Sequence, residues 1–377
     1  MASSHTLEEI LRGLTAESAP ELARSLGGGK VQCLACGHRC RISEGRSGAC
    51  RVRFVEGGSL RRPRGYVAAV ACDPIEKKPF FHAFPGRDAL TFGMLGCDLH
   101  CPFCQNWETS QVARDDDAMS LPACVSAEEL AEAGQAEGAA VLVSSYNEPL
   151  ITADWAAEVF RPARAQGMVC GFVSNGNATL EVLEYLRPLV DIYKVDLKCM
   201  TERGYQMLGG KLSTVLDTLR WLKKLGFWVE VVTLVIPGYN DDPGELRAMA
   251  RFLAELDRDI PWHVTAFHPD YKMQDRGRTE AASLFSAYDI GREAGLRFVY
   301  TGNRPGETGD RESTFCPGCG GLLVKRRGFQ VLENKMQGDA CPSCRARIPG
   351  VWEKDPPRFS RGGGFPKPIR IGRRFTP

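Results

Sequence analysis

The stretch GMLGCDLHCPFCQNWETSQ at residues 93–111 places three cysteines in one short loop, with the spacing Cys97-x3-Cys101-x2-Cys104. The apolar run ALTFGML at 89–95 leads into this loop and predicts a buried β-strand. A four-iron cluster has four corners to ligate, so three thiolates leave one iron open to another molecule. The loop therefore predicts an iron–sulfur cluster with one vacant iron.

A zinc site made of Cys97, His100, Cys101 and Cys104 is the alternative, because thiolates and imidazoles both bind zinc. These residues follow one another more closely than the ligands of the usual two-knuckle zinc site. A loop directly after a first β-strand is also a common place for a ligand site. Both observations favour the cluster.

Short apolar runs alternate with longer runs of helical period from about residue 89 onward. Strands are predicted at 89–95, 139–145, 168–174, 191–197, 227–235, 263–267 and 296–300. Helices are predicted near 126–137, 152–166, 179–188, 213–225, 244–257 and 279–294. This alternation predicts an α/β fold with a parallel sheet, either a barrel or a doubly wound sheet. In both, ligands bind at the carboxyl ends of the strands.

The cysteine motif, with Phe103 before its last cysteine, resembles the signature of the radical S-adenosylmethionine (SAM) superfamily. Across about residues 30–352, DPIEKKPFFH, YNEP, VDLK, IPGYND and FHPDYKM more narrowly resemble the AmmeMemoRadiSam-system enzymes, relatives of pyruvate formate-lyase activating enzymes. The resemblance implies a partial (β/α)6-type barrel with a [4Fe-4S] cluster on Cys97, Cys101 and Cys104. It also implies reductive cleavage of SAM to a 5′-deoxyadenosyl radical that abstracts hydrogen from a protein or a small molecule.

The same resemblance implies SAM contacts at the strand ends. The residues concerned are Glu148 for the amino group, Ser174 and Asn175, Asp196 and Lys198 for the ribose and carboxylate, His268, and more weakly Asn303. The residue types also permit a helix-capping turn at 174–176 and an exposed ion pair of Asp196 with Lys198. No protein acid or base is identified by the sequence.

Two further cysteine groups flank the β/α region. Cys316-x2-Cys319-x21-Cys341-x2-Cys344 matches a zinc ribbon. For Cys33, Cys36, Cys40 and Cys50, zinc is favoured over an auxiliary iron–sulfur cluster, and His38 is an alternative ligand. The remaining thiols, at Cys72, Cys124, Cys170 and Cys199, are interpreted as small core or loop residues.

The chain is expected to hold four parts: a helix and cysteine-rich module at 1–88, the barrel at 89–310, the ribbon at 311–352 and a Pro/Gly/Arg-rich tail at 353–377. Residues 1–30 are read as an amphipathic helix and a glycine link, and the tail as mobile or draped. A net charge of +2, no signal peptide and no long apolar run favour a cytoplasmic protein without nucleic-acid or membrane partners.

Expected partners are an electron donor such as a flavodoxin or ferredoxin, and, from the resemblance, Memo-like and AMMECR-like proteins. A glycyl-radical activase is a subordinate hypothesis, and RNA modification is disfavoured because few aromatics accompany the basic tail. A non-enzymatic zinc scaffold is the alternative of another class, and it leaves Glu148, Asp196 and Lys198 unexplained.

Overall fold

A mixed sheet of nine strands forms the centre of the computed structural model, which describes residues 6–118, 120–355, 357 and 367–374. The strand order is β16-β15-β14-β13-β12-β11-β9-β8-β20. Its parallel part consists of β9 (Asp88–Gly93), β11 (Val141–Ser144), β12 (Val169–Ser174), β13 (Ile192–Asp196), β14 (Trp228–Val235), β15 (Trp262–Ala266) and β16 (Val299–Gly302). Every one of these strands was predicted, which confirms the α/β partial barrel.

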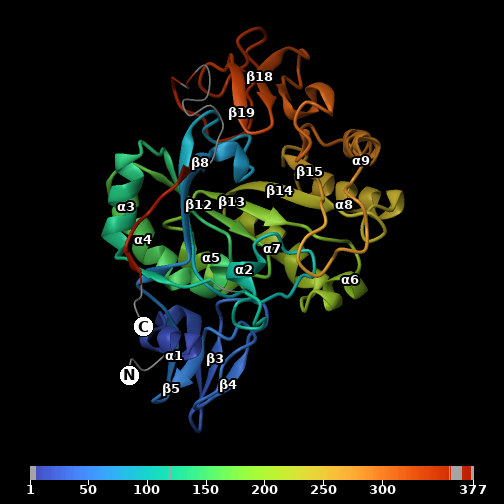
Figure 1. The fold of residues 1–377 in the computed structure, drawn as a ribbon. Helices are drawn as coiled ribbons and strands as arrows, with labels where there is room; N and C mark the ends of the chain where they lie inside the picture. The colour runs from blue at the N-terminus through green and yellow to red at the C-terminus, as the bar shows by residue number, and fades with distance from the viewer. Residues whose placement is uncertain (1–5, 119, 356, 358–366, 375–377) are drawn as a thin grey trace.

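Helices follow the parallel strands and include the six predicted from the sequence (Figure 1). They are α3 (Ala127–Ala136), α4 (Ala153–Ala165), α5 (Leu180–Leu186), α6 (Glu202–Met207), α7 (Leu212–Lys224), α8 (Pro243–Leu256) and α9 (Ala281–Glu293), with the short α2 (Trp107–Ser110) in the cysteine loop. Local sequence sets their ends. The Ser126 hydroxyl accepts a hydrogen bond from the Glu129 N–H, and the Glu129 carboxylate accepts one from the Ser126 N–H, which caps α3.

The N-terminal module is mainly β-structure, so the expectation of a helix and glycine link over 1–30 was wrong beyond α1 (Leu7–Gly13). Its strands are β1 (Thr15–Glu17), β2 (Ala23–Gly27), β3 (Lys30–Cys33), β4 (Arg41–Ser43), β5 (Phe54–Glu56) and β6 (Ser59–Pro63). Gly27, Gly28 and Gly29 all have positive φ, so the glycines form the turn of the β2–β3 hairpin. Residues 1–5 lie outside the described residues.

The chain enters the central sheet before residue 88. Strand β8 (Ala69–Pro74) pairs antiparallel with β9 and extends the sheet within the range predicted for the N-terminal module. On its outer edge lies β20 (Lys367–Pro368), while β21 (Arg373–Arg374) pairs with β10 (Ala123–Cys124), which in turn pairs with β7 (Tyr66–Val67). Parts of the predicted mobile tail, at 356, 358–366 and 375–377, lie outside the described residues.

The C-terminal ribbon consists of β17 (Thr314–Phe315), β18 (Leu322–Arg327) and β19 (Gln330–Asn334), and it lies at the opposite end of the molecule from the N-terminal module (Figure 1). Its apolar residues Leu323 and Val331 share one buried cluster with Phe81, Phe298 and Tyr300 of the barrel region. Because this core is continuous, the ribbon is built into the barrel and is not an independently hanging module.

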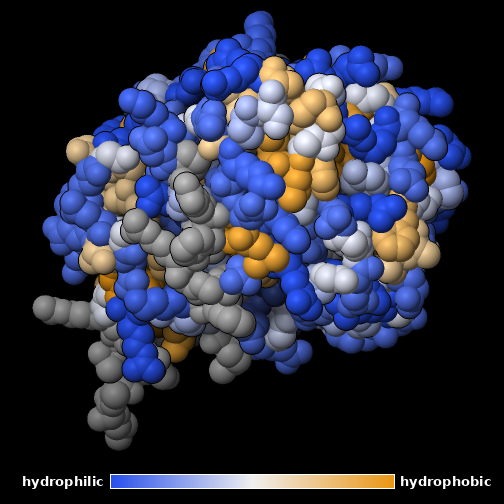
Figure 2. Space-filling model, turned by 90° about the horizontal axis from the view of Figure 1, so that it is seen from above, coloured by the Kyte–Doolittle hydropathy of each residue, from blue (hydrophilic) through white to orange (hydrophobic). Residues whose placement is uncertain are grey.

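The face on the ribbon side is mostly hydrophilic, and hydrophobic residues gather on it only in small groups (Figure 2). None of the helices in the described ranges is long and apolar enough to cross a membrane.

Candidate functional site

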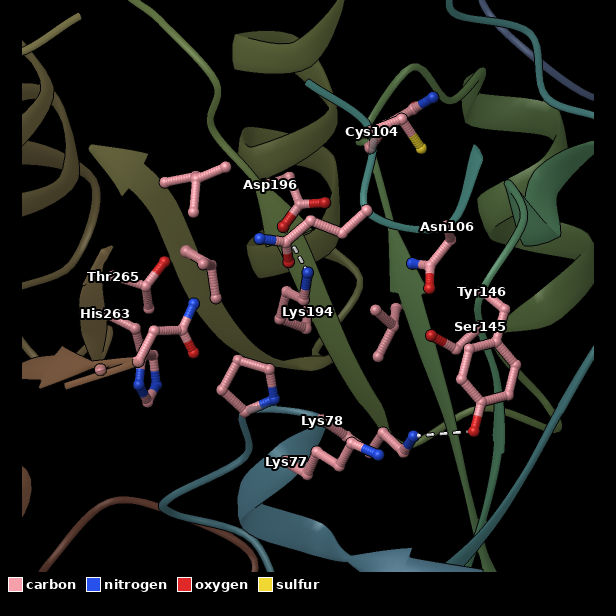
Figure 3. A pocket seen from close by; sticks show the side chains of 18 of the residues that line it. Lys77, Lys78, Cys104, Asn106, Ser145, Tyr146, Lys194, Asp196, His263 and Thr265 are labelled. Atoms are coloured by element: carbon pink, nitrogen blue, oxygen red, sulfur yellow. Dashed lines mark hydrogen bonds and ion pairs between the residues drawn. The ribbon is translucent and has the colours of Figure 1, made fainter. Parts of the chain in front are cut away.

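A cavity of 390 Å³ opens at the carboxyl ends of the parallel strands (Figure 3). Most residues predicted for the site line it: Cys97, Cys101, Phe103, Cys104, Glu148, Asn175, Asp196, Lys198 and Asn303. Parallel strands bring their ends to one edge, which is why residues so distant in sequence meet here. The fold thus joins the cysteine loop and the predicted SAM contacts in a single site.

The three cysteines of the loop between β9 and α2 are largely buried, and burial raises the pKa of each thiol, that of Cys101 to about 12. Polar groups nevertheless lie within hydrogen-bond distance of the sulfurs. The Leu99 N–H donates to Cys97 Sγ at 3.4 Å, and the Ser110 hydroxyl lies 3.1 Å from Cys104 Sγ. Burial disfavours the thiolate form of these cysteines when no metal is bound. Their hydrogen-bond partners would support the thiolates once a metal centre stabilises them.

The loop does not form a compact site for one ion. Within the described parts of the chain, one group of three or more His, Cys, Asp or Glu residues has all its ligand atoms within 4.8 Å of one another: Cys316, Cys319, Cys341 and Cys344. His100 is exposed and does not line the cavity, and its ring lies against Gly209. The zinc alternative for Cys97, His100, Cys101 and Cys104 is therefore disfavoured.

Glu148, at the end of β11, is a buried carboxylate held by neutral donors. Its oxygens accept hydrogen bonds from the Leu150 N–H at 3.1 Å, the Ser174 hydroxyl at 2.8 Å and the Asn175 N–H at 2.7 Å. Burial, and secondly the charge of Asp98, raises the pKa of Glu148. A carboxylate in this setting would be stabilised by a bound ammonium group, which fits the predicted contact to SAM.

Ser174 and Asn175 have different roles in the structure. Ser174 does not line the cavity; its hydroxyl orients Glu148 and accepts a hydrogen bond from the Gly176 N–H at 3.0 Å. Asn175 lines the cavity and donates from Nδ2 to Asp98 Oδ1 at 2.7 Å. Asp98 is buried next to Cys97, and sequence reasoning missed it because its partners come from a distant strand end.

Asp196 lies between two lysines at the end of β13. Its carboxylate pairs with Lys194 and, at 3.3 Å, with Lys198, so the interpretation as an isolated exposed pair was too simple. The ammonium of Lys198 also lowers the pKa of Cys101 against the effect of burial. Lys194 was missed, although the alternation of Lys194 and Asp196 along one strand places both side chains on the same face.

His268 is not brought into the cavity. Its side chain is 54% exposed and lies 3.8 Å from Asp270, and its Nδ1 is 3.1 Å from Gln105 Nε2 in the cysteine loop. Its contact to SAM stays a prediction. Asn303 lines the cavity in a left-handed conformation with φ 64°, and its Nδ2 donates to the Ala266 carbonyl at 3.1 Å.

Across the cavity from Asp196, the segment after β8 presents Lys77 and Lys78 (Figure 3). Both ammonium groups pair with the same oxygen of Asp73, at 3.4 and 2.6 Å. Tyr146, which also has a positive φ, places its hydroxyl 3.3 Å from both Lys78 Nζ and Asp73. Burial lowers the pKa of Lys78 to about 8. Sequence reasoning assigned no role to this group: the lysines and Asp73 are close in the chain, but Tyr146 joins them from a distant segment.

The ribbon cysteines form the compact group already named. Cys316 Sγ lies 3.5 Å from Cys344 Sγ, and Cys319 Sγ lies 3.8 Å from Cys341 Sγ. Thiolates that share one tetrahedral ion with bonds near 2.3 Å stand about 3.8 Å apart. The four sulfurs therefore fit a single metal ion.

Residues 92–253 match the sequence profile of the radical SAM superfamily. The uncharacterized protein MJ0808 of Methanocaldococcus jannaschii is 35% identical over 323 residues, which are 85% of this chain and 95% of that protein. The pyruvate formate-lyase-activating enzyme of Listeria monocytogenes is 27% identical over 204 residues, 51% of this chain and 81% of that enzyme. A radical SAM methyltransferase from Sphaerobacter thermophilus aligns with a TM-score of 0.45 and 16% identity, over 63% of this chain and 71% of that one.

This chain therefore belongs to the radical SAM superfamily, and the non-enzymatic scaffold is set aside. More particularly, it is a radical SAM enzyme distantly related to pyruvate formate-lyase activating enzymes. Cys97, Cys101 and Cys104 would hold the [4Fe-4S] cluster, and Glu148, Asp196 and Lys198 offer the charges that SAM requires. When bound, the cluster and SAM together supply a 5′-deoxyadenosyl radical.

Proposed function

We propose that this enzyme abstracts a hydrogen atom from a small anionic molecule bound at the end of the cavity lined by Lys77 and Lys78. The observation that carries the proposal is the sharing of one carboxylate, Asp73, by both lysines. Two ammonium groups on one carboxylate leave an excess positive charge facing the cavity, which a substrate carboxylate or phosphate would neutralise. Hydrogen abstraction leaves 5′-deoxyadenosine and a substrate radical.

The ribbon supports a small substrate because it covers this end of the cavity. Gly328 and Phe329, at the turn between β18 and β19, are part of the lining. Arg326 fixes the ribbon in place: its guanidinium donates to the Phe81 carbonyl at 2.8 Å and pairs with the buried Glu76 at 3.5 Å. A wall held by buried polar contacts leaves less room for a protein loop than an open barrel would.

The glycyl-radical activase is the second candidate, and the distant relationship to pyruvate formate-lyase activating enzymes favours it. Such an enzyme admits a glycine-bearing loop of a large protein to the radical. It would require the ribbon wall to move. We rank it below the small-molecule proposal for that reason.

The wider setting remains a set of proposals that rest on the sequence. They are membership of the AmmeMemoRadiSam system with Memo-like and AMMECR-like partners, an electron donor such as a flavodoxin or ferredoxin, a cytoplasmic location, and zinc as the ribbon metal. The four close sulfurs of the ribbon support a metal ion there.

The test is substrate-stimulated formation of 5′-deoxyadenosine by anaerobically reconstituted and reduced enzyme. Extract of the source organism is divided into a protein fraction and a low-molecular-mass filtrate, and the filtrate is divided again by anion exchange. Stimulation by the anion-retained filtrate is expected, and it should weaken in Lys77→Ala and vanish in Cys101→Ala. Stimulation by the protein fraction alone would instead favour the activase, and stimulation unaffected by Lys77→Ala would overturn the role of this lysine.

A further inference from the structure

Cys40 of the N-terminal module shares a feature with the metal-site cysteines elsewhere in the chain: its sulfur accepts a hydrogen bond from a backbone N–H. The donor is the Ala49 N–H, at 3.3 Å from Cys40 Sγ. The Leu99 N–H makes the same contact to Cys97, and the Gly318 N–H to Cys316, both at 3.4 Å. Such donors stabilise the thiolate, which is the form that binds metal.

A thiol outside these groups behaves differently. The buried Cys170 donates from its own Sγ to the Phe160 carbonyl at 3.9 Å, as a protonated thiol does.

The four N-terminal thiols also share one region of the module. Cys33 and Cys40 lie side by side, because the Cys33 N–H donates to the Cys40 carbonyl at 2.9 Å. Cys36 lies in the turn between them, where its carbonyl accepts from the Arg39 N–H at 3.0 Å, and Cys50 directly follows Ala49, whose N–H contacts Cys40 Sγ. Three of the four cysteines are buried, and Cys40 is half-buried. A buried group of four thiolates needs metal to balance its charge.

The spacing of these sulfurs differs from that of the ribbon. The ribbon sulfurs all lie within 4.8 Å of one another, whereas no three ligand atoms of the N-terminal group do so in the described part of the chain. The Cys97, Cys101 and Cys104 sulfurs likewise do not all lie within 4.8 Å of one another. Thiolates bound to separate irons of a four-iron cluster stand farther apart than thiolates that share one ion. His38 is occupied elsewhere, since its Nε2 lies 3.1 Å from the Asp98 carbonyl.

We propose that Cys33, Cys36, Cys40 and Cys50 hold a second iron–sulfur cluster, in a module packed directly against the loop of the SAM cluster. The packing is specific. The Gly37 N–H donates to the Asn177 carbonyl at 2.8 Å, and Asn177 Nδ2 donates to Asp98 Oδ2 at 2.8 Å, one residue from Cys97. A Cβ at position 37 would stand 2.3 Å from Asn177 Oδ1, so only glycine permits this approach.

The decisive experiment removes the first cluster and measures what iron remains. Full-length Cys97→Ala/Cys101→Ala/Cys104→Ala protein is reconstituted anaerobically with iron and sulfide, and its iron, sulfide and zinc are measured together with its electron paramagnetic resonance spectrum after reduction. We expect about four irons per chain and the signal of a reduced cubane cluster. Iron at background, with zinc at two ions per chain, would show that both terminal modules hold zinc and would overturn the proposal.

A variant of the N-terminal cysteines keeps the proposal testable if the triple variant fails to fold. In Cys33→Ser/Cys36→Ser, iron is expected to fall from about eight to about four per chain, while the ribbon metal is unchanged. Cys124→Ser is the matched control, because this half-buried thiol belongs to no group, and its metal content should equal that of the unmodified protein. Unchanged iron in the double variant would count against the second cluster as firmly as background iron in the triple variant.

Discussion

The Ser174 hydroxyl donates a hydrogen bond of 2.8 Å to Glu148 Oε1, which ties the carboxyl end of β12 to that of β11. The same carboxylate receives the Asn175 N–H at 2.7 Å, so two consecutive residues fix its orientation. Ser174 itself does not line the cavity. It is a positioning residue, and its effect on SAM passes through Glu148.

Replacing Ser174 with Ala should weaken SAM binding without dismantling the cluster. Loss of one hydrogen bond to a charged group costs about 1.5 kcal/mol, so the dissociation constant for SAM should rise about tenfold. Calorimetric titration of reconstituted protein checks the affinity, while the iron content should stay unchanged. Ser213→Ala, on the exposed side of α7, is the control. Equal SAM affinity in both variants would show that Ser174 does not contribute to SAM binding.

Glu148→Gln should change how stability depends on pH. Burial raises the pKa of Glu148 above its usual 4.5, so the folded chain keeps a proton that the unfolded chain releases as pH rises past that value. Where the folded state binds more protons, stability falls as pH rises. Thermal unfolding from about pH 5 to about pH 8 should therefore show the variant gaining stability over the unmodified protein as pH increases.

The exposed Glu184→Gln provides the comparison for this pH series, since its carboxylate is in solvent in both states. Parallel stability curves for Glu148→Gln and the unmodified protein would contradict the raised pKa. SAM binding supplies an independent check: if its ammonium meets Glu148, binding should release a proton, detectable as a buffer-dependent heat.

Asp196→Asn should destabilise the fold as well as weaken SAM binding. The substitution leaves Lys194, whose side chain is 6% exposed, without its partner. Removing one member of a buried ion pair costs several kcal/mol, and we expect about 2–3 kcal/mol here because Asp196 is partly exposed. Denaturant unfolding measures the change. Asp275→Asn removes a carboxylate that is 69% exposed and paired with Arg276, and it should be neutral within about 0.5 kcal/mol.

Cys316→Ser should remove one metal ion per chain and loosen the ribbon. Because Leu323 and Val331 share a core with Phe81 and Tyr300, the melting temperature of the whole protein should fall. Phe329 would no longer be held at the cavity, so substrate-stimulated 5′-deoxyadenosine formation should drop more than SAM affinity. Metal analysis and the two assays are run on the same sample. Full stimulated activity with a metal-free ribbon would show that the ribbon is not needed as a wall of the substrate cavity.

The sequence predicted the barrel and its cysteine loop because both depend on local signals. Hydrophobic periodicity located the strands, and the spacing of Cys97, Cys101 and Cys104 identified their chemistry. The roles of Lys78 and Asp98 could not be predicted, since they depend on contacts with Tyr146 and with Asn175, which lie far away in the chain. Residues 15–30 were misjudged for a related reason: short strands in a small module owe their conformation to pairing more than to periodicity.

Strand β20 closes the outer edge of β8, where the Ile369 N–H continues the pairing by donating to the Val70 carbonyl at 3.0 Å. An uncovered sheet edge carries a row of free N–H and C=O groups that invites strands of other molecules. Pro368 contributes no N–H of its own, and Lys367 places a charge beside Glu137 at 2.5 Å. This short segment therefore acts against aggregation, and its deletion should make concentrated protein precipitate before its active site is impaired.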